Sequence, residues 1–506
     1  MVKQSDQHAK QQIAMHYDVV IIGAGLGGLE CGYILQKNGK KVCIVEKNAL
    51  IGGCLQTFRR RGMSFDTGFH YVGGLEKGQM LHKLFSYFGL MDLPWVKMDN
   101  AFDEVFIEGR KYTFRNGFDN FQKTLTEAFP HEAENIAEYV SLLRKVGENT
   151  NNSFSPRDND EFYSQSLFAQ SAYEYLEKQF ADPALRDVVS GTSLKLELNA
   201  EKLPLYIFAQ LNSSFIQSAY RLQGGGMQIA ETLRKHIEEM GGVVRRNAEV
   251  TGVVENDGKI SAVVINNGTE NIEADFFISD LHPATTMNIL SDSKLIRNIY
   301  RKRICSLENT YGMFTANIAL KPDKIKYLNR NIYAYEHGDL WHQDFTDGVS
   351  AILISMQPPF GGCEFTQNID ILTPMNWSKV ERWIGTKIGN RGNEYDNLKK
   401  EMTQKCITLA SKYIDGLADA IDEVYTSTPL TYSDYVGTAQ GAAYGIRKDY
   451  NKLMFTVLTP RTPVPNLLLT GQNLNLHGIL GVSMTSVFTC AEILGMQNIT
   501  NDLNNY

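Results

Sequence analysis

The chain has 506 residues, which is long enough to bury a large core and to divide into two or more domains. Its 50 Lys and Arg residues against 57 Asp and Glu residues give a formal net charge of −7, which gives no reason to expect a nucleic-acid partner. The seven cysteines show no CxxC pair and no metal spacing, so we expect a reducing compartment, no disulfide framework and no metal site. The N-terminal "MVKQSDQHAKQQIAMHY" lacks the apolar core of a secretory signal and predicts a short polar tail on a cytoplasmic protein.

The first predicted unit is a strand, a glycine-rich turn and a helix, in "DVVIIGAGLGGLECGYILQK" (18–37). The β-branched residues 19–22 are typical of a strand, and residues 29–37 carry apolar side chains at helical spacing. In a GxGxxG turn between them, Gly23 makes the tight turn, Gly25 lets a pyrophosphate approach the backbone, and Gly28 lets the helix pack closely. The free N–H groups at the helix start then face the phosphates.

A second strand, predicted over 41–45, ends in Glu46, which follows Gly28 by 18 residues. An acid at this place accepts hydrogen bonds from the ribose hydroxyls of an adenosine and disfavours a 2′-phosphate. A glycine-rich structural turn is the alternative, but the strands, the helix end and the acid all agree in register. The sequence therefore predicts a dinucleotide site, which in this first unit could serve either NAD or FAD.

The segment "NLLLTGQNLNLHGILGVSMTSVFTCAEILG" (466–495) repeats the order of apolar strand, glycine turn and helix. Its turn, at Gly471, Gln472 and 478–481, is expected to direct helix-start N–H groups at a second part of a long ligand. Residues 462–491 contain no charged side chain, but Pro463 and Pro465 interrupt them. We therefore expect a buried strand and helix here, not a membrane span.

Between these two units the pattern predicts helices over 121–129, 135–150 and 224–242, with a loop at 151–161. Strands are expected over 243–268, joined by an Asn-Asp-Gly turn, and over 274–280. From about residue 281 to 426 aromatic-rich strands such as 310–320 and 349–356 appear, together with a helix over 394–414. This pattern predicts a substrate domain that covers the cofactor.

These motifs carry a family resemblance. The GxGxxG turn, Glu46, the double glycine at 52–53 and the C-terminal "TGQ" resemble the flavoprotein group of amine oxidases and phytoene desaturases. Within that group "IGGCLQTFRRRGMSFDTGFHYVGG" (51–74) is most similar to retinol saturases and carotenoid cis-trans isomerases, and the resemblance continues through 222–263, 441–445 and the C-terminal segment. Over about 91–212 and 300–420 only the general layout matches. Cys54 stands where amine oxidases of the group usually carry Arg, which argues against that branch.

The resemblance implies FAD as cofactor and an α/β fold: a Rossmann-like FAD-binding domain of the glutathione-reductase type with an interleaved α+β substrate domain. The FAD-binding domain is expected to comprise 1–90, 213–290 and 427–506, and the substrate-binding domain 91–212 and 291–426. The cofactor-binding residues expected from the motifs and the resemblance are Gly23, Ala24, Gly25, Gly28, Glu46, Lys47, Gly53, Cys54, Thr57, Gly68, Val250, Gly471, Gln472, Gly481 and Val482.

For this family the chemistry is a hydride transfer between the flavin and a carbon of a hydrophobic conjugated polyene, which desaturates, saturates or isomerises the chain. Saturation also needs a proton, for which His70 and Tyr71 are the catalytic candidates, with His477 near the C-terminal turn. His70 and Tyr71 have the alternative role of packing beside the cofactor. Because only one nucleotide fingerprint is present, we expect an external electron donor or acceptor.

Two other functions stay open. One is an amine oxidase or porphyrinogen oxidase on the same scaffold. The other is a lipid or prenyl carrier without a working flavin, as in prenyl-protein escort factors, although the intact glycine set argues for a bound cofactor. Peripheral membrane contact also stays open, with "LPLYIFAQLNSSFIQSAY" (203–220) either as an apolar patch at the pocket mouth or, as we favour, a helix facing the core.

Overall fold

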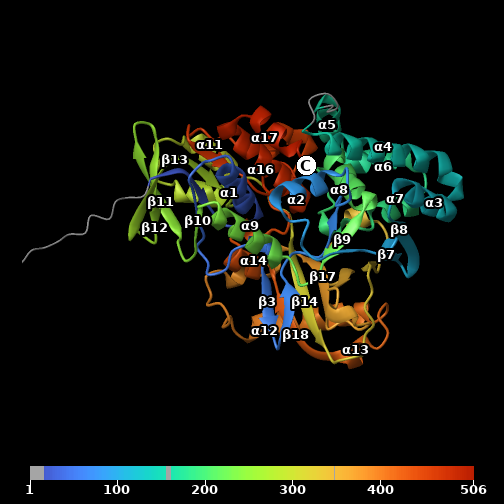
Figure 1. The fold of residues 1–506 in the computed structure, drawn as a ribbon. Helices are drawn as coiled ribbons and strands as arrows, with labels where there is room; N and C mark the ends of the chain where they lie inside the picture. Colours follow the sequence, from blue (N-terminus) through green and yellow to red (C-terminus); the bar gives the residue numbers. More distant parts are fainter. Residues whose placement is uncertain (1–15, 155–160, 347) are drawn as a thin grey trace, which may run out of the picture.

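The computed structural model describes residues 16–154, 161–346 and 348–506, so the loop predicted at 151–161 falls largely outside the described residues. One seven-stranded sheet lies at one end of the molecule (Figure 1). Its order is β10 (Val243–Arg245), β2 (Val42–Val45), β1 (Tyr17–Ile22), β13 (Glu270–Ser279), β12 (Lys259–Ile265) and β11 (Val250–Asn256), with β19 (Leu467–Leu469) also paired to β13. Strands β10, β2, β1, β13 and β19 run parallel, whereas β11 and β12 continue the sheet as antiparallel hairpins.

Three helices pack beside this sheet: α1 (Leu26–Lys37), α9 (Met227–Glu239) and α16 (Gly478–Leu494). The predicted strands at 19–22 and 41–45 and the helices within 29–37 and 224–242 are thus confirmed. Residues of β1 and β2 are almost entirely buried, as expected for parallel strands covered on both faces.

A buried carboxyl group joins α1 to α16. Glu30 on α1 accepts hydrogen bonds from Ser483 (2.6 Å) and Ser486 (3.1 Å) on α16. Burial raises the pKa of Glu30 to about 8, so at neutral pH this carboxyl group is largely protonated and carries no buried charge. The contact fixes the two helices, and therefore their N-termini, side by side.

The second seven-stranded sheet has the order β18 (Ile421–Ser427), β14 (Gly312–Leu320), β17 (Asn368–Met375), β16 (Ala351–Met356), β15 (Asn331–Tyr335), β7 (Ala101–Ile107) and β8 (Arg110–Arg115). The strands and helix expected over 310–320, 349–356 and 394–414 appear here as β14, β16 and α12 (Asn393–Ala410). Helix α12 packs on one face of the sheet, and a helical layer with α3 (Phe118–Ala128), α4 (Ala133–Asn151) and α8 (Leu205–Gln217) lies on the other.

The remaining elements connect these layers. The short strands are β3 (Thr57–Arg60), β4 (Met63–Asp66), β5 (Val72–Gly73), β6 (Trp95–Lys97) and β9 (Ala219–Leu222). The other helices are α2 (Met80–Phe88), α5 (Glu161–Phe168), α6 (Ala172–Gln179), α7 (Pro183–Ser190), α10 (Pro283–Ile289), α11 (Asn298–Cys305), α13 (Leu417–Ala420), α14 (Pro429–Tyr435), α15 (Leu453–Thr456) and α17 (Met496–Leu503).

Helix α8 resolves the two interpretations of residues 203–220. Ten of its thirteen residues are buried, among them Ile207, Phe208 and Ile216, so it is a core helix and not an exposed patch. Among the helices of the described ranges, none has the length and apolar character that crossing a membrane requires.

Two buried polar side chains connect the short strands to neighbouring elements. Arg221 on β9 donates to Ser355 (3.2 Å), to Asn331 (2.9 Å) and to the carbonyl oxygen of Met356, all in the second sheet. Asp66 at the end of β4 accepts from the backbone N–H of Gly226 before α9 (2.9 Å). The proposed division into two discontinuous domains stays a prediction, and these contacts connect its segments.

Candidate functional site

A cavity of about 450 Å³ runs from the first sheet to the second. At one end its walls are the glycine turns after β1 and β19, with Glu46 and Val250. At the other end the walls are mostly apolar and aromatic, and they include Leu194, Tyr71, Leu211, Phe215, Met313, Leu353 and Leu372. The cavity therefore joins a polar, glycine-lined part to an apolar chamber.

The first glycine turn has the geometry that the sequence predicts. Gly23 has a φ of +100°, which favours glycine, and a Cβ atom on Gly28 would lie 2.2 Å from the carbonyl oxygen of Gly23. This clash shows that position 28 must be glycine for α1 to approach the turn. The cavity wall includes Gly23 and Gly25, whereas Gly28 supports the turn from behind.

Glu46 lies at the cavity wall beside this turn. One carboxylate oxygen accepts from the N–H of Ala24 (3.0 Å) and the other from the N–H of Asn48 (2.9 Å), so the carboxylate is fixed at the cavity wall. Lys47 and Val250 line the same end. An acid held beside the glycine turn suits a ribose diol, as FAD requires.

Asp280, directly after β13, places its carboxyl group against the same turn. It accepts hydrogen bonds from the backbone N–H groups of Gly25 and Gly28, and a Cβ atom on Gly25 would lie 2.5 Å from its Oδ2. Burial is the main cause that raises the Asp280 pKa to about 7, and the carboxylate of Glu46 adds to it. The Asp280 carboxyl group thus already occupies the N–H groups of Gly25 and Gly28, which would otherwise be free to bind a phosphate.

The second glycine turn faces the first across Asp280. A Cβ atom on Gly471 would lie 2.5 Å from Asp280 Oδ1, and Gly471 has a φ of +88°. Residues 478–482, the first turn of α16, line the cavity, so the positive end of this helix dipole is directed at it. Two helix N-termini and two glycine turns around one cavity fit the diphosphate and flavin of FAD.

Cys54 lines the cavity after the double glycine. Burial raises the pKa of its thiol to about 11, so the sulfur stays protonated at neutral pH and is a poor nucleophile. Gly68 packs against it, since a Cβ atom there would lie 3.1 Å from the Cys54 carbonyl oxygen. These two residues pack closely against each other at the cavity wall.

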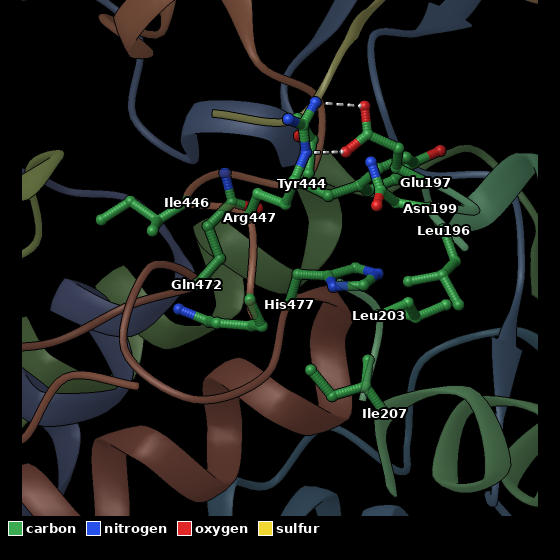
Figure 2. A pocket seen from close by; sticks show the side chains of 12 residues that line it. Leu196, Glu197, Asn199, Leu203, Ile207, Tyr444, Ile446, Arg447, Gln472 and His477 are labelled. Carbon is green, nitrogen blue, oxygen red and sulfur yellow. Dashed lines mark hydrogen bonds and ion pairs between the residues drawn. The ribbon is translucent and has the colours of Figure 1, made fainter. Parts of the chain in front are cut away.

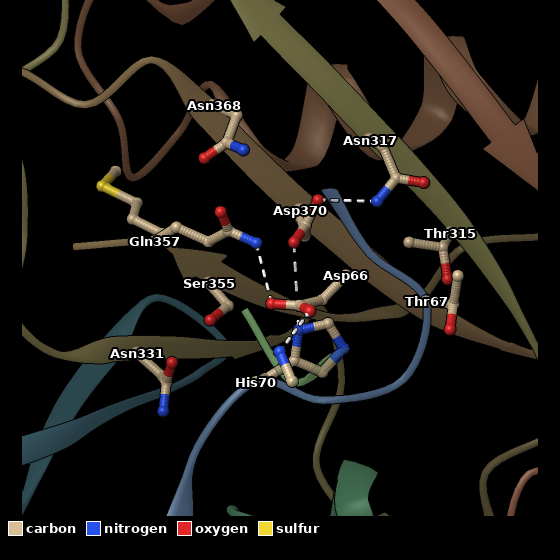
Figure 3. A network of polar contacts seen from close by, with 12 residues as sticks. Asp66, Thr67, His70, Thr315, Asn317, Asn331, Ser355, Gln357, Asn368 and Asp370 are labelled. Carbon is tan, nitrogen blue, oxygen red and sulfur yellow. Dashed lines mark hydrogen bonds and ion pairs between the residues drawn. The ribbon is translucent and has the colours of Figure 1, made fainter. Parts of the chain in front are cut away.

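His70 lies at the cavity wall with a polar network behind it (Figure 3). Its Nδ1 is 4.0 Å from Oδ2 of Asp370, whose Oδ1 accepts from Asn317 (2.6 Å). Burial, together with the charge of Arg221, lowers the His70 pKa to about 4, so the ring is neutral at pH 7. Within the described part of the chain, its Nε2 has no hydrogen-bond partner.

Tyr71 belongs to a different network. Its hydroxyl group donates to Asp103 (2.9 Å), is 2.7 Å from the hydroxyl of Tyr333 and accepts from Lys195 (2.8 Å). Burial raises the Tyr71 pKa well above its usual value, so the phenol is not an acid at physiological pH. The two neighbouring residues therefore face different polar partners.

His477 lies between the glycine-lined part of the cavity and the apolar chamber. It precedes α16 and donates from Nε2 to the backbone oxygen of Lys195 (3.1 Å). Figure 2 shows His477 in an adjoining pocket of about 30 Å³, where Arg447 forms an ion pair with Glu197 (2.6 Å). Burial lowers the His477 pKa to about 4, so it too is neutral at pH 7.

The structure brings most of the predicted site residues together. The cavity is lined by Gly23, Gly25, Glu46, Lys47, Gly53, Cys54, Gly68, His70, Tyr71, Val250, Gly471, Gln472, His477, Gly481 and Val482. The lining does not include Ala24 and Gly28, which support the turn from behind, or Thr57, which lies on β3 beside Gly225. Within the described residues no cluster of side chains suits a metal ion.

The lining residues that sequence reasoning missed include Asp280 and Lys195. Asp280 ends a predicted strand, and the rule that ligands bind at the carboxyl ends of parallel strands could have found it. Lys195 lies in a short 3₁₀ segment (Ser193–Lys195) that carries no motif, so no local signal marks it.

Comparison with known proteins agrees with this site. The model of the flavin containing amine oxidoreductase family matches residues 26–310. All-trans-retinol 13,14-reductase of Rattus norvegicus is 26% identical over 529 residues, covering 96% of this chain and 87% of the relative. Prolycopene isomerase 1, chloroplastic, of an Oncidium hybrid cultivar is 23% identical, covering 86% of this chain and 76% of the relative.

Among solved structures, an oxidoreductase from Methanosarcina mazei superimposes with a TM-score of 0.64 at 15% identity, covering 95% of this chain and all of that one. At this identity the likeness shows the fold alone. It confirms the predicted fold class.

The first prediction concerns Glu46. Replacing Glu46 by Arg removes the ribose acceptor and its two backbone hydrogen bonds and adds a misplaced charge, so FAD affinity should fall at least about 30-fold, from the loss of about 2 kcal/mol. The ratio of flavin to protein absorbance after gel filtration measures this. Glu273→Arg, at an exposed position of β13, is the matched control and should keep its FAD. Full flavin content in the Glu46 variant would refute the assignment.

The second prediction concerns Asp280. A bound diphosphate is anionic and raises the Asp280 pKa further, so binding FAD takes up a proton. FAD affinity should therefore fall as the pH rises above about 7, with the Kd rising about tenfold between pH 6 and pH 8. Asp280→Asn cannot titrate and should show a flat profile in a fluorescence titration of the FAD-free protein. The same pH slope in both proteins would assign the proton to another group.

Proposed function

Because the chain belongs to the flavin containing amine oxidoreductase family, we propose that it is an FAD-dependent oxidoreductase that reduces a carbon–carbon double bond of a hydrophobic conjugated polyene. The observation that carries this proposal is the continuity of the cavity, from the two glycine turns into the apolar chamber. The retinol reductases and prolycopene isomerases to which the chain is similar act on substrates of this class.

The glycine turns, Glu46 and the first turn of α16 would hold FAD. When bound, FAD supplies hydride chemistry. This chain's own residues would then exclude water and orient the polyene along the apolar walls formed by Leu211, Phe215 and Leu353. A linear, apolar conjugated chain suits walls of this kind.

His70 and Tyr71 were predicted as proton donors, with packing beside the cofactor as the alternative, and we propose that both are positioning residues. The neutral His70 ring lines the cavity, and its Nε2 is buried without a hydrogen-bond partner among the described residues. Tyr71, with its high pKa, holds neighbouring polar groups in place instead of losing its own proton.

Two further predictions accompany this function. One is an external electron donor or acceptor, since the sequence has one nucleotide fingerprint. The other is a cytoplasmic protein that makes peripheral contact with a membrane, from which a hydrophobic substrate would enter.

The proposal is tested by reducing the FAD-loaded protein without oxygen and adding all-trans-retinol. Reoxidation of the flavin, with loss of one double bond from the retinol in chromatography, is the expected result. Persisting reduced flavin with a changed double-bond geometry would mean an isomerase. If an amine reduces the flavin, and only oxygen reoxidises it with release of peroxide, the protein is an amine oxidase.

Replacing His70 by Ala should leave FAD content unchanged and slow turnover about tenfold, because the loss of the ring opens the cavity wall and positions the polyene less well, at a cost of about 1.4 kcal/mol. Steady-state rates and flavin absorbance measure the two effects. His131→Ala, at an exposed histidine that pairs with Asp182, is the control. Unchanged turnover in the His70 variant would leave it a packing role only.

A further inference from the structure

Lys195 is a buried cation in the apolar chamber. It ends the 3₁₀ segment Ser193–Lys195, its side chain is 12% exposed, and it lines the cavity. Within the described residues, the cavity lining has one other lysine, Lys47, which lies next to Glu46 at the glycine-lined end. Lys195 is thus the ammonium group of the chamber in which the polyene is proposed to bind.

The contacts of Lys195 fix its ammonium group without using all of its protons. Nζ donates to the hydroxyl of Tyr71 (2.8 Å), lies 3.8 Å from Oδ2 of Asp103 and sits 4.0 Å from the ring centroid of Phe215. The aromatic face and the carboxylate stabilise a positive charge in this position. Among the described residues Nζ makes this one hydrogen bond, so protons remain for a ligand in the cavity.

Tyr71 and Asp103 form a rigid support behind the lysine. The Tyr71 hydroxyl donates to Asp103, so it accepts from both Lys195 and Tyr333 and is fully hydrogen-bonded. Asp103 is completely buried, and its other oxygen accepts from Asn331 (2.8 Å). A saturated network of this kind holds the ammonium group in one place.

Four other groups of the cavity lining are unsuited to giving a proton at neutral pH. His70 and His477 are neutral, with pKa values lowered to about 4 by burial, and burial raises the pKa of Tyr71 well above its usual range. Burial also raises the Cys54 pKa to about 11. In contrast, burial lowers the Lys195 pKa to about 8, against the opposing effect of Asp103, so its ammonium is both populated and acidic at pH 7.

We propose that Lys195 Nζ gives the proton that completes reduction of the polyene double bond, with Tyr71 and Asp103 as its positioning residues. This inference rests on the proposed function. One carbon of the double bond receives a hydride, with its electron pair, from reduced FAD, and the adjacent carbon receives the proton from Nζ. The π bond, the bond that held the hydride hydrogen on the reduced flavin and an N–H bond of Lys195 would break, two C–H bonds would form, and the flavin would be left oxidised. Lys195, left as a neutral amine, regains a proton from water, and the external electron donor restores the reduced flavin.

Several titratable and charged groups face this ammonium and set its pH dependence. Tyr71 and Asp103 contact it, Tyr333 has its ring 5.8 Å away, and His477 binds its backbone oxygen. Arg221 reaches Asp103 through Asn331. Of these, Asp103 acts on Lys195 directly and favours its charged form.

The test uses the FAD-loaded protein, chemically reduced without oxygen, and follows its reoxidation by all-trans-retinol in a stopped-flow instrument from pH 6 to pH 10. The rate constant of the unmutated protein should fall above about pH 8. Lys195→Gln should be at least about 100-fold slower and lose this pH dependence. Lys195→Arg keeps the charge but not the acidic proton, and it should be slow as well.

Two measurements separate proton transfer from a structural role. Lys202→Gln, whose side chain pairs with Glu308, is the matched control and should react like the unmutated protein. The affinities of Lys195→Gln for FAD and for retinol should stay within about threefold of the unmutated values. Because the folded protein holds the Lys195 pKa below its unfolded value, the Tm of the unmutated protein should rise relative to that of Lys195→Gln between pH 8 and pH 10.

The outcomes distinguish this inference from the function on which it rests. An unchanged rate and pH profile in Lys195→Gln, full activity in Lys195→Arg, or no relative gain in Tm would overturn the role of Lys195 and leave the reductase intact. If reduced flavin in the unmutated protein is not reoxidised by retinol at any pH, the proposed function fails and this inference with it.

Discussion

The site depends on the register of three parallel strands that come from distant parts of the chain. Ile22 of β1 pairs with Ser279 of β13, which in turn pairs with Leu469 of β19. The first glycine turn, Asp280 and the second glycine turn therefore meet at one edge of one sheet. A slip of one residue in β13 would turn Asp280 away from the glycines and reverse the buried face of the strand.

Burial then sorts the acids and bases of this site. Burial keeps several ionisable groups around the cavity uncharged at neutral pH, namely two histidines, the Tyr71 phenol and the Cys54 thiol. Lys195 keeps its ammonium because Asp103 and the Phe215 ring compensate part of the cost. A chamber that is dry enough to bind a polyene thus still contains a group that can give a proton. Tyr71 and Asp103, the latter on a strand of the second sheet, hold this group in place.

The cofactor half of the molecule could be predicted from sequence because its signals are local. A strand, a glycine turn and a helix follow one another within residues 17–37, and the same order recurs near the C-terminus. The catalytic half could not be predicted in this way. Lys195 touches a hydroxyl 124 positions away, and Tyr71 pairs with Tyr333 across 262 positions, so only the fold brings them together. His70 and Tyr71, adjacent in sequence, were grouped as proton donors, yet their side chains join separate networks.

The central claim is that one continuous cavity holds FAD and polyene end to end. The most direct measurement is a crystal structure of the FAD-loaded protein with bound all-trans-retinol. The account predicts diphosphate density at the two glycine turns, and the polyene in the chamber between Phe215 and Leu353, with one double bond in van der Waals contact with Lys195 Nζ. A flavin whose ring does not reach this chamber, or a retinol bound outside it, would contradict the account.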